Sequence, residues 1–364
     1  MATAVVVGGG IGGLAAAVAL GRRGWEVRVL ERAPALGEVG AGISLWSNAV
    51  HALDELGIGD AVRARSLREL SAGVRAPRGG WLTRADVAAV RERFGLPVIL
   101  HRADLLDILR GAVPDGAVRT GVTVRAVRPD GTVEHDGGTE TADLVVGADG
   151  IRSRVREAVC GRVEPRYAGY TAWRAVVDPP VPIREFGETW GRGARFGTAP
   201  LADGRVYCFA VYDAAEGSRA TPAEVAARFA DWYEPIPALL AEAGRTTFLH
   251  NDIYDLPRLP RYVAGRVALL GDAAHAMTPD LGQGACQALE DAVVLARRAG
   301  EPGGLAAYDR ERRPRTQRIA ARSARVGAVA QWSNPALVGL RTALARLTPA
   351  SAQLRALAPI LDWR

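Results

Sequence analysis

Apolar runs and helical patterns alternate at the beginning of the chain. Residues 4–7 form a β-branched run typical of a buried parallel strand, and residues 14–23 are alanine-rich with helical character. Gly24 would end that helix, and residues 26–30 (EVRVL) predict a second strand. The order predicts a βαβ unit of about 30 residues, the unit from which parallel sheets are built.

Further helices and strands follow up to about residue 165. Residues 47–56 and 60–67 have helical patterns, and residues 102–110 (RADLLDILR) predict an amphipathic helix. Residues 122–128 and 143–146 predict strands, and we expect both to return to the first sheet.

The pattern changes between residues 166 and 262, where polar and apolar positions alternate. This alternation favours antiparallel strands at 171–177, 194–196 and 205–212, followed by two helices at 222–233 and 237–243. Further along, we expect a buried strand at 266–270 (RVALL) and helices at 285–299 and from 308 onward.

These elements predict an α/β fold in which a parallel-sheet domain is interrupted by a mostly antiparallel one. The first domain would comprise residues 1–73, 99–165 and 262–310. The second would comprise residues 74–98 and 166–261, and C-terminal helices would occupy residues 311–364.

Charge is distributed unevenly along the 364 residues. All 46 basic side chains are arginine, so the chain has no Schiff-base lysine, pyridoxal-phosphate anchor or Walker-A lysine. Residues 297–364 hold 13 arginines and 4 acids, which leaves 33 arginines and 36 acids in residues 1–296. The net charge of +6 therefore reflects the C-terminal segment and gives little support for nucleic-acid binding. That segment is either a solvated helical layer or a surface that steers anionic ligands.

The cysteines and the N-terminal stretch bear on location. Cys160, Cys208 and Cys286 form no CxxC pair, which argues against a disulfide framework or a zinc site and favours a reducing cytoplasm. Residues 1–21 carry no charged side chain, but six of them are glycine and no basic residue precedes them. We therefore expect no targeting segment, no membrane span and no metal site.

A glycine cluster connects the first strand to the first helix. Gly8, Gly10 and Gly13 match the GxGxxG pattern, whose glycines permit a tight turn, a close approach to pyrophosphate, and helix–strand packing. The helix N-terminus favours a phosphate. Glu31 ends the second strand, 18 residues after Gly13, where a carboxylate accepts hydrogen bonds from ribose hydroxyls. The pattern predicts a dinucleotide site without distinguishing NAD from FAD.

Two further motifs follow predicted strands. The GADG sequence at 147–150 places Asp149 at the carboxyl end of a strand, where it forms either a ligand site or a simple turn. The glycine-rich stretch 271–284 follows the RVALL strand and opens the helix at 285–299. Two glycine-rich connections from strand to helix predict an extended dinucleotide that is contacted at both ends.

These motifs, in this order, resemble the class A FAD-dependent aromatic hydroxylases, which are p-hydroxybenzoate hydroxylase-like flavoprotein monooxygenases. The resemblance rests on GGGIGG (8–13) with Glu31, GADG (147–150) and GDAAHAMTPDLGQGACQALEDA (271–292), and it covers roughly residues 1–315. Within the family, residues 40–60 and GYTAW (169–173) are most similar to the FAD-dependent urate hydroxylases and the salicylate hydroxylase-like group. The resemblance implies a Rossmann-like FAD-binding domain with the antiparallel domain as the roof of the substrate pocket.

The resemblance also implies which residues bind FAD. The glycine motif would hold the pyrophosphate, Glu31 the adenosine ribose and Asp272 the ribityl chain, while residues 279–284 would lie beside the isoalloxazine ring. The complete implied set is Gly8, Gly10, Gly13, Glu31, Arg32, Arg102, Val124, Asp149, Gly150, Asp272, Pro279, Gly282 and Gly284.

The catalytic arginine, tyrosine and aspartate of the urate enzymes fall by position on Arg195, Tyr207 and Asp280. Such a set could orient an anionic or enolisable ring and relay its proton. The residues taken alone also allow a solvated arginine, a core tyrosine and a helix-capping acid.

The implied activity is that of an FAD-dependent monooxygenase. NADH or NADPH would reduce the flavin, and O₂ would form a C4a-hydroperoxide that hydroxylates an aromatic or heteroaromatic small molecule. No second GxGxxG is present, so we expect no separate NAD(P)H domain. A flavin-dependent epoxidase or reductase of the same fold, acting on a non-aromatic substrate, is the alternative. The chain would be a monomer or a homodimer.

Overall fold

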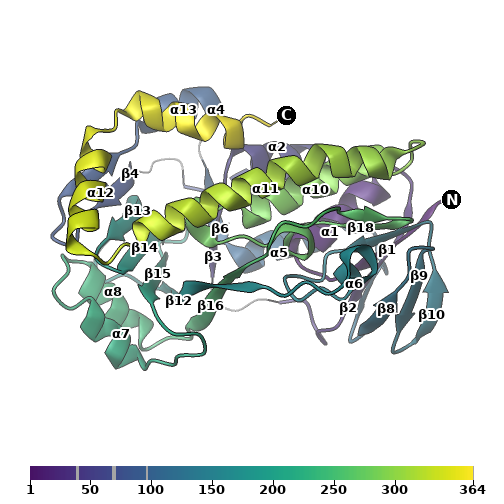
Figure 1. Cartoon of the computed structure of the whole chain (residues 1–364), viewed down its shortest axis with the longest axis horizontal. Coiled ribbons are helices and arrows are strands. Elements are labelled where there is room, and N and C mark those ends of the chain that lie inside the picture. The colour runs from purple at the N-terminus through teal and green to yellow at the C-terminus, as the bar shows by residue number, and fades with distance from the viewer. Residues whose placement is uncertain (38–40, 68–70, 96, 364) are drawn as a thin grey trace.

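Two large β-sheets, two smaller ones and the helices around them make up the computed structural model, which describes residues 1–37, 41–67, 71–95 and 97–363 (Figure 1). The first sheet has the strand order β17-β18-β11-β1-β2-β7. Its strands are β1 (Thr3–Val7), β2 (Glu26–Glu31), β7 (Val118–Thr120), β11 (Leu144–Gly147), β17 (Val263–Ala264) and β18 (Val267–Leu269). Neighbouring strands run parallel except β17 and β18.

The predicted βαβ unit is confirmed, with α1 (Ile11–Gly21) between β1 and β2. Helix α1 is buried along nearly its whole length because α10 (Gly284–Arg298) packs across it. Small residues permit this close contact, since a Cβ at Gly12 would lie 2.7 Å from Leu270 and 3.3 Å from Ala288. The alanine-rich composition of α1 thus reflects packing in the first core rather than a solvent-exposed helix.

The strand predicted at 122–128 does not return to the first sheet, and that expectation is wrong. It forms β8 (Val124–Val127), which pairs with β9 (Thr132–His135) in a separate sheet of order β10-β9-β8 with β10 (Gly138–Thr141). The reason is local, because a short turn at Gly131 brings β9 back along β8 as a hairpin. The strand predicted at 143–146, β11, does join the first sheet next to β1.

The second sheet is the larger one, with the order β16-β12-β15-β14-β13-β4-β5. Its strands are β4 (Ser71–Arg75), β5 (Trp81–Arg84), β12 (Arg166–Val177), β13 (Glu185–Trp190), β14 (Ala194–Pro200), β15 (Val206–Asp213) and β16 (Leu249–Asp255). All pairings are antiparallel except that of β4 with β13. The domain boundary that we placed after residue 73 would fall within β4 (Ser71–Arg75), and it stays a prediction.

Opposite faces of the second sheet have different neighbours. Phe196, Cys208 and Tyr212 belong to a core that α7 (Pro222–Arg228) and α8 (Ile236–Ala243) cover. Side chains alternate along a strand, so Arg195 on β14 and Val211 on β15 lie on the other face. We call the helix-covered side the outer face and the Arg195 side the inner face.

The remaining helices connect and enclose the sheets (Figure 1). Helix α11 (Gly304–Ala330) is the longest and runs beside α10. The others are α2 (Ser47–Glu55), α3 (Gly59–Arg63), α4 (Val87–Phe94), α5 (Arg102–Ala112), α6 (Val155–Cys160), α9 (Asp272–His275), α12 (Pro335–Leu347) and α13 (Ala350–Leu361), with the 3₁₀ turn η1 (Pro279–Leu281) and the strand pair β3 (Gly42–Leu45) and β6 (Val98–His101). Within the described ranges, no helix is both long and apolar enough to cross a membrane.

Candidate active site

The glycine motif forms the turn between β1 and α1. Gly8 has a φ of +107°, and a Cβ at this position would lie 2.4 Å from the Ala148 carbonyl oxygen. A Cβ at Gly13 would lie 1.9 Å from the carbonyl oxygen of Gly8, so both positions require glycine for packing. At Gly10, by contrast, no described atom lies within 4 Å of the Cβ position. Gly10 therefore borders open space at the start of α1.

This open space has the features of a phosphate site. Gly10 is the N-cap of α1, and among the described residues no side chain caps the helix. The first N–H groups of the helix are therefore available to an anion, which the helix dipole also favours. Glu31 lies next to this turn, where its carboxylate accepts hydrogen bonds from Gly9 N at 2.6 Å and Ala33 N at 2.8 Å.

The GD segment forms a second site at the same edge of the first sheet. Asp272 follows β18 as the first residue of α9 and is exposed, and a Cβ at Gly284 would lie 4.0 Å from its carboxylate. Gly282 is left-handed at φ +60° and separates η1 from α10. Because β1 and β18 are parallel strands separated only by β11, their carboxyl ends lie about 10 Å apart.

The residues present therefore fit an extended dinucleotide such as FAD. An open glycine and an uncapped helix lie at one end, and the exposed Asp272 beside the start of α10 lies at the other.

Other predicted cofactor residues have varied surroundings. Asp149 accepts hydrogen bonds from Ser153 Oγ at 2.5 Å and Arg154 N at 2.7 Å, so its carboxylate caps the start of α6. Gly150 has a φ of +80°. Arg32 is exposed beside Glu31, Arg102 begins α5, Val124 is buried in the first core, and Pro279 is exposed at the start of η1.

The structure brings Arg195 and Asp280 together. Arg195 Nη2 lies 2.7 Å from Asp280 Oδ1, and the two side chains are 2% and 0% exposed. Arg195 also donates from Nε to Gln331 Oε1 at 2.7 Å and lies 3.3 Å from Glu188 Oε2. Burial disfavours the charge on Arg195, but Glu188 and Asp280 outweigh it and raise its pKa above the ordinary value. The guanidinium is therefore a permanent cation inside the protein.

The tyrosine that contacts Asp280 is Tyr170 rather than Tyr207. Tyr170 donates from its hydroxyl to Asp280 Oδ2 at 2.8 Å, and its ring lies 5.6 Å from the Arg195 guanidinium carbon. Burial, followed by the Asp280 charge, raises the pKa of Tyr170. Tyr207 lies on the same inner face but pairs with Ala199, four residues along β14 from Arg195. Burial raises the pKa of Tyr207 to about 12.

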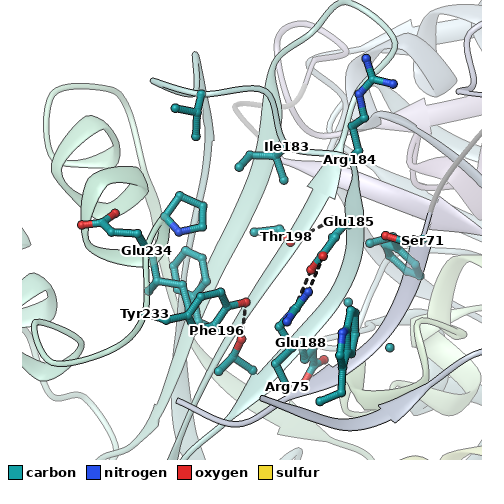
Figure 2. A pocket seen from close by; sticks show the side chains of 18 of the residues that line it. Ser71, Arg75, Ile183, Arg184, Glu185, Glu188, Phe196, Thr198, Tyr233 and Glu234 are labelled. Atoms are coloured by element: carbon teal, nitrogen blue, oxygen red, sulfur yellow. Dashed lines mark hydrogen bonds and ion pairs between the residues drawn. The ribbon is translucent and has the colours of Figure 1, made fainter. Parts of the chain in front are cut away.

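A cavity of about 280 Å³ adjoins this cluster. It is lined by Tyr170 and Thr278 and, on α11 and just beyond it, by Ala324, Ala328 and Gln331. A larger cleft of about 590 Å³ lies elsewhere, on the outer face of the second sheet (Figure 2). Its lining includes Phe196 and Thr198, which alternate with Arg195 along β14 and so point away from the cluster. The smaller cavity is therefore the one that the Arg195–Asp280 pair adjoins.

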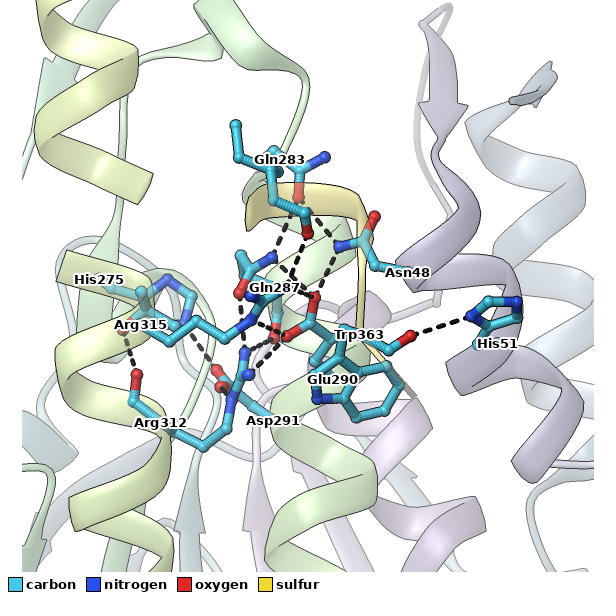
Figure 3. A network of polar contacts seen from close by, with 12 residues as sticks. Asn48, His51, His275, Gln283, Gln287, Glu290, Asp291, Arg312, Arg315 and Trp363 are labelled. Atoms are coloured by element: carbon cyan, nitrogen blue, oxygen red, sulfur yellow. Dashed lines mark hydrogen bonds and ion pairs between the residues drawn. The ribbon is translucent and has the colours of Figure 1, made fainter. Parts of the chain in front are cut away.

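A buried polar network surrounds Glu290 and Asp291 in the middle of α10 (Figure 3). Arg312 on α11 contacts Glu290 and lies 2.7 Å from Asp291, and all three side chains are fully buried. Asp291 also accepts hydrogen bonds from Gly271 N at 3.0 Å and from His275 Nε2 at 2.6 Å. The network ties α9 and α11 to α10, and through them it positions the GD segment.

Sequence reasoning missed several of these groups. Tyr170 lies within the GYTAW stretch, but only the strand register shows that it reaches η1. Arg156 also went unnoticed, although it is 3% exposed and donates to the carbonyls of Ile151 and Ala273, which joins the GADG turn to the GD segment. A buried arginine gives no sequence signal in a chain with 46 of them.

Comparisons with known proteins are consistent with this geometry. A family model described as an FAD binding domain matches residues 1–323. The aurachin C monooxygenase/isomerase of Stigmatella aurantiaca is 42% identical over 359 residues, covering 95% of this chain and 94% of that protein. The 2-heptyl-3-hydroxy-4(1H)-quinolone synthase of Pseudomonas aeruginosa is 36% identical over 376 residues, covering 97% and 96%.

Solved structures of FAD-dependent hydroxylases are also similar to this chain over nearly its whole length. Klebsiella pneumoniae HpxO in complex with FAD and uric acid superposes with a TM-score of 0.91 at 31% identity, covering 99% of this chain and 97% of that one. A salicylate hydroxylase substrate complex superposes with a TM-score of 0.82 at 26% identity, covering 100% and 96%. The similarity therefore extends over both sheets and the C-terminal helices.

Proposed function

The chain belongs to the class A flavoprotein monooxygenases, the FAD-dependent aromatic hydroxylases, and from this premise we propose that it hydroxylates a nitrogen-containing heteroaromatic small molecule. The observation that carries the proposal is the buried Arg195–Asp280–Tyr170 cluster beside a cavity. A fixed cation, a carboxylate and a hydroxyl at one place suit a ring with both a polar acceptor and an acidic proton.

The similar proteins support this substrate class. One of them is named as the synthase of a 4(1H)-quinolone, and another was solved in complex with uric acid. Both rings carry an N–H conjugated with a carbonyl, and loss of that proton makes a ring carbon more electron-rich. Such a carbon is the site at which an electrophilic oxygen is accepted, and bound FAD supplies the activated oxygen.

We assign a separate role to each member of the cluster. Arg195 holds the Asp280 side chain in one orientation through the 2.7 Å contact. Tyr170 lines the cavity and donates to Asp280, so it can pass a proton from the substrate to that carboxylate. Tyr207, on the same inner face, would contact the substrate ring further along the sheet.

FAD would be held by the residues at the edge of the first sheet. The start of α1 at Gly10 would bind the pyrophosphate, with Glu31 at the ribose and Asp272 at the ribityl chain. The buried polar network around Glu290 and Asp291 fixes the position of α10, whose N-terminus would face the isoalloxazine ring.

We further propose that NADH or NADPH is the electron donor and O₂ the oxidant. Both would act without a second nucleotide-binding domain, because the sequence has a single GxGxxG. A reducing cytoplasm is supported by three free thiols, Cys160, Cys208 and Cys286. The assembly would be a monomer or a homodimer.

The function is tested with purified protein reconstituted with FAD. NADH and NADPH consumption is followed with 4-quinolones and urate as N-heterocycles, and with salicylate as an aromatic control that lacks the ring N–H. We expect an N-heterocycle to stimulate consumption most and to acquire one atom of ¹⁸O from ¹⁸O₂. Stimulated consumption without ¹⁸O in the product would indicate a reductase, and stimulation only by a non-aromatic alkene would indicate an epoxidase.

A further inference from the structure

Helix α12 presents an apolar face to solvent. Leu337, Leu340, Leu344 and Leu347 are 41%, 51%, 55% and 78% exposed, although large apolar side chains are usually buried. At 100° per residue these leucines fall within one half of the helix circumference. The rest of this exposed half consists of Ala336, Gly339 and Ala343, with Arg346 at its margin.

The opposite half of α12 is the more polar one, and it faces the protein. Arg341 is 3% exposed and donates to the carbonyl oxygens of Val329 at 3.2 Å and Gly191 at 2.7 Å. Asn334 caps the helix start by accepting from Ala336 N at 2.9 Å. These contacts fix the rotation of the helix, so the leucine side is held outward rather than left exposed by a loosely attached helix.

The charged side chains on α12 and α13 have one sign. Residues 335–361 contain three arginines and no aspartate or glutamate. Arg346 on α12 and Arg355 on α13 are both exposed. An apolar helix face with cationic side chains at its margin is the pattern of helices that lie in the interface of an anionic membrane.

We propose that α12 docks the protein reversibly onto an anionic lipid surface, with its leucines in the headgroup region. A second copy of the chain is a poorer occupant for two reasons. The cationic margins of two copies would repel each other. The helix is about 20 Å long and about 10 Å wide, so it offers a footprint of roughly 200 Å², against about 800 Å² per partner in a stable complex. A lipid surface needs no such area.

The proposal is tested by flotation of the full chain, loaded with FAD, with phospholipid vesicles. We expect the protein to float with vesicles that contain phosphatidylglycerol, to float much less with pure phosphatidylcholine, and to be released by salt. The Leu340→Gln/Leu344→Gln variant should reduce partitioning by at least about tenfold. Ala306→Gln, at an exposed site near the other end of α11, should leave it unchanged.

Two variants with the same change of charge separate electrostatic attraction to the vesicle from the burial of the leucine side chains. Arg346→Gln should weaken binding to anionic vesicles about fivefold, whereas Arg310→Gln, exposed near the start of α11, should have no effect. Circular dichroism and FAD content check that each variant is folded. Vesicle binding does not depend on turnover, so its result is distinct from that of the activity assay.

Three outcomes would overturn the proposal. The first is an absence of flotation with anionic vesicles at low salt, and the second is equal flotation of the wild type and the double leucine variant. The third is a dimer of the wild type, seen by sedimentation, that the double leucine variant converts to monomers without any vesicle binding. In that case the occupant of the helix face is a second copy of the chain.

Discussion

Tyr170 and Tyr207 share the inner face of one sheet, yet only Tyr170 contacts Asp280. Alternation along a strand tells which side a residue faces, and on this basis both tyrosines suit a pocket. How far each tyrosine lies from the Arg195–Asp280 pair along the sheet depends on the register between neighbouring strands. Tyr207 pairs with Ala199, about 13 Å along β14 from Arg195, whereas Tyr170 lies within reach of η1.

Tyr170→Phe removes one hydroxyl from the cluster. Because that hydroxyl donates to Asp280, we expect kcat to fall about tenfold to a hundredfold, with a loss of about 1 kcal/mol in the free energy of unfolding. The matched control is Tyr308→Phe on α11, whose buried hydroxyl donates to the Leu269 carbonyl at 2.8 Å. It should lose similar stability and keep its kcat. Equal kcat in both variants would remove Tyr170 from the proton path.

Gly10→Ala tests the proposed pyrophosphate site. No described atom lies near the added methyl group, so the fold should be retained, but the methyl would occupy the space of the phosphate. We expect FAD occupancy, measured by absorbance after purification, to fall at least about tenfold. Gly111→Ala also adds a methyl with no described atom within 4 Å, at the end of α5, and should retain its flavin. Full occupancy in Gly10→Ala would contradict the assignment.

At the scale of elements, the contact between α10 and α11 depends on buried charge. Asp291 is wholly buried, which by itself would raise its pKa, but His275 and Arg312 lower the pKa to about 2. Glu290 shares Arg312 and also pairs with Arg315. The sequence of neither helix predicts these buried ion pairs, because Glu290-Asp291 looks like an exposed polar pair on an amphipathic helix.

Asp291→Asn should destabilise the protein in a pH-dependent way. A pKa lowered from about 3.8 to about 2 contributes about 2 kcal/mol of stability above pH 4, which is lost as pH falls through 2. Urea unfolding of wild type and variant should therefore differ most at neutral pH and converge between pH 4 and pH 2. Glu311→Gln, an exposed acid on α11, serves as control with a change below about 1 kcal/mol. A difference that stays constant down to pH 2 would show that Asp291 does not titrate in this way.

At the scale of the whole molecule, the sequence predicted the strands of the parallel sheet better than the contacts between distant segments. The glycine motifs and the apolar strands 4–7, 143–146 and 266–270 were sufficient for the parallel sheet, because buried strands and close turns restrict residue type strongly. The cluster at Arg195 brings β12 and β14 together with η1, where Asp280 lies 110 residues after Tyr170 and 85 residues after Arg195. Local patterns carry no information on such a contact, so the sequence did not single out Tyr170, and the catalytic role of Tyr207 stays a prediction.

The arginine-rich C-terminal segment bears on the proposed use of NAD(P)H as the electron donor. Arg312, Arg313 and Arg315 are all paired with carboxylates, so their field is largely neutralised. We therefore expect KM for NAD(P)H to rise less than about twofold between low and physiological salt. A rise of tenfold, reduced by Arg318→Gln and Arg322→Gln, would instead show that these helices steer the nucleotide.

The parallel pairing of β4 with β13 constrains how such enzymes can be recombined. Residues 71–75 lie beside residues 185–189 although more than a hundred positions separate them. A chimera that exchanges only the contiguous stretch 166–255 would join a foreign β13 to the resident β4 and leave one edge of the second sheet mismatched. Substrate preference should therefore transfer between relatives as two coupled segments, and single crossovers between them should be selected against.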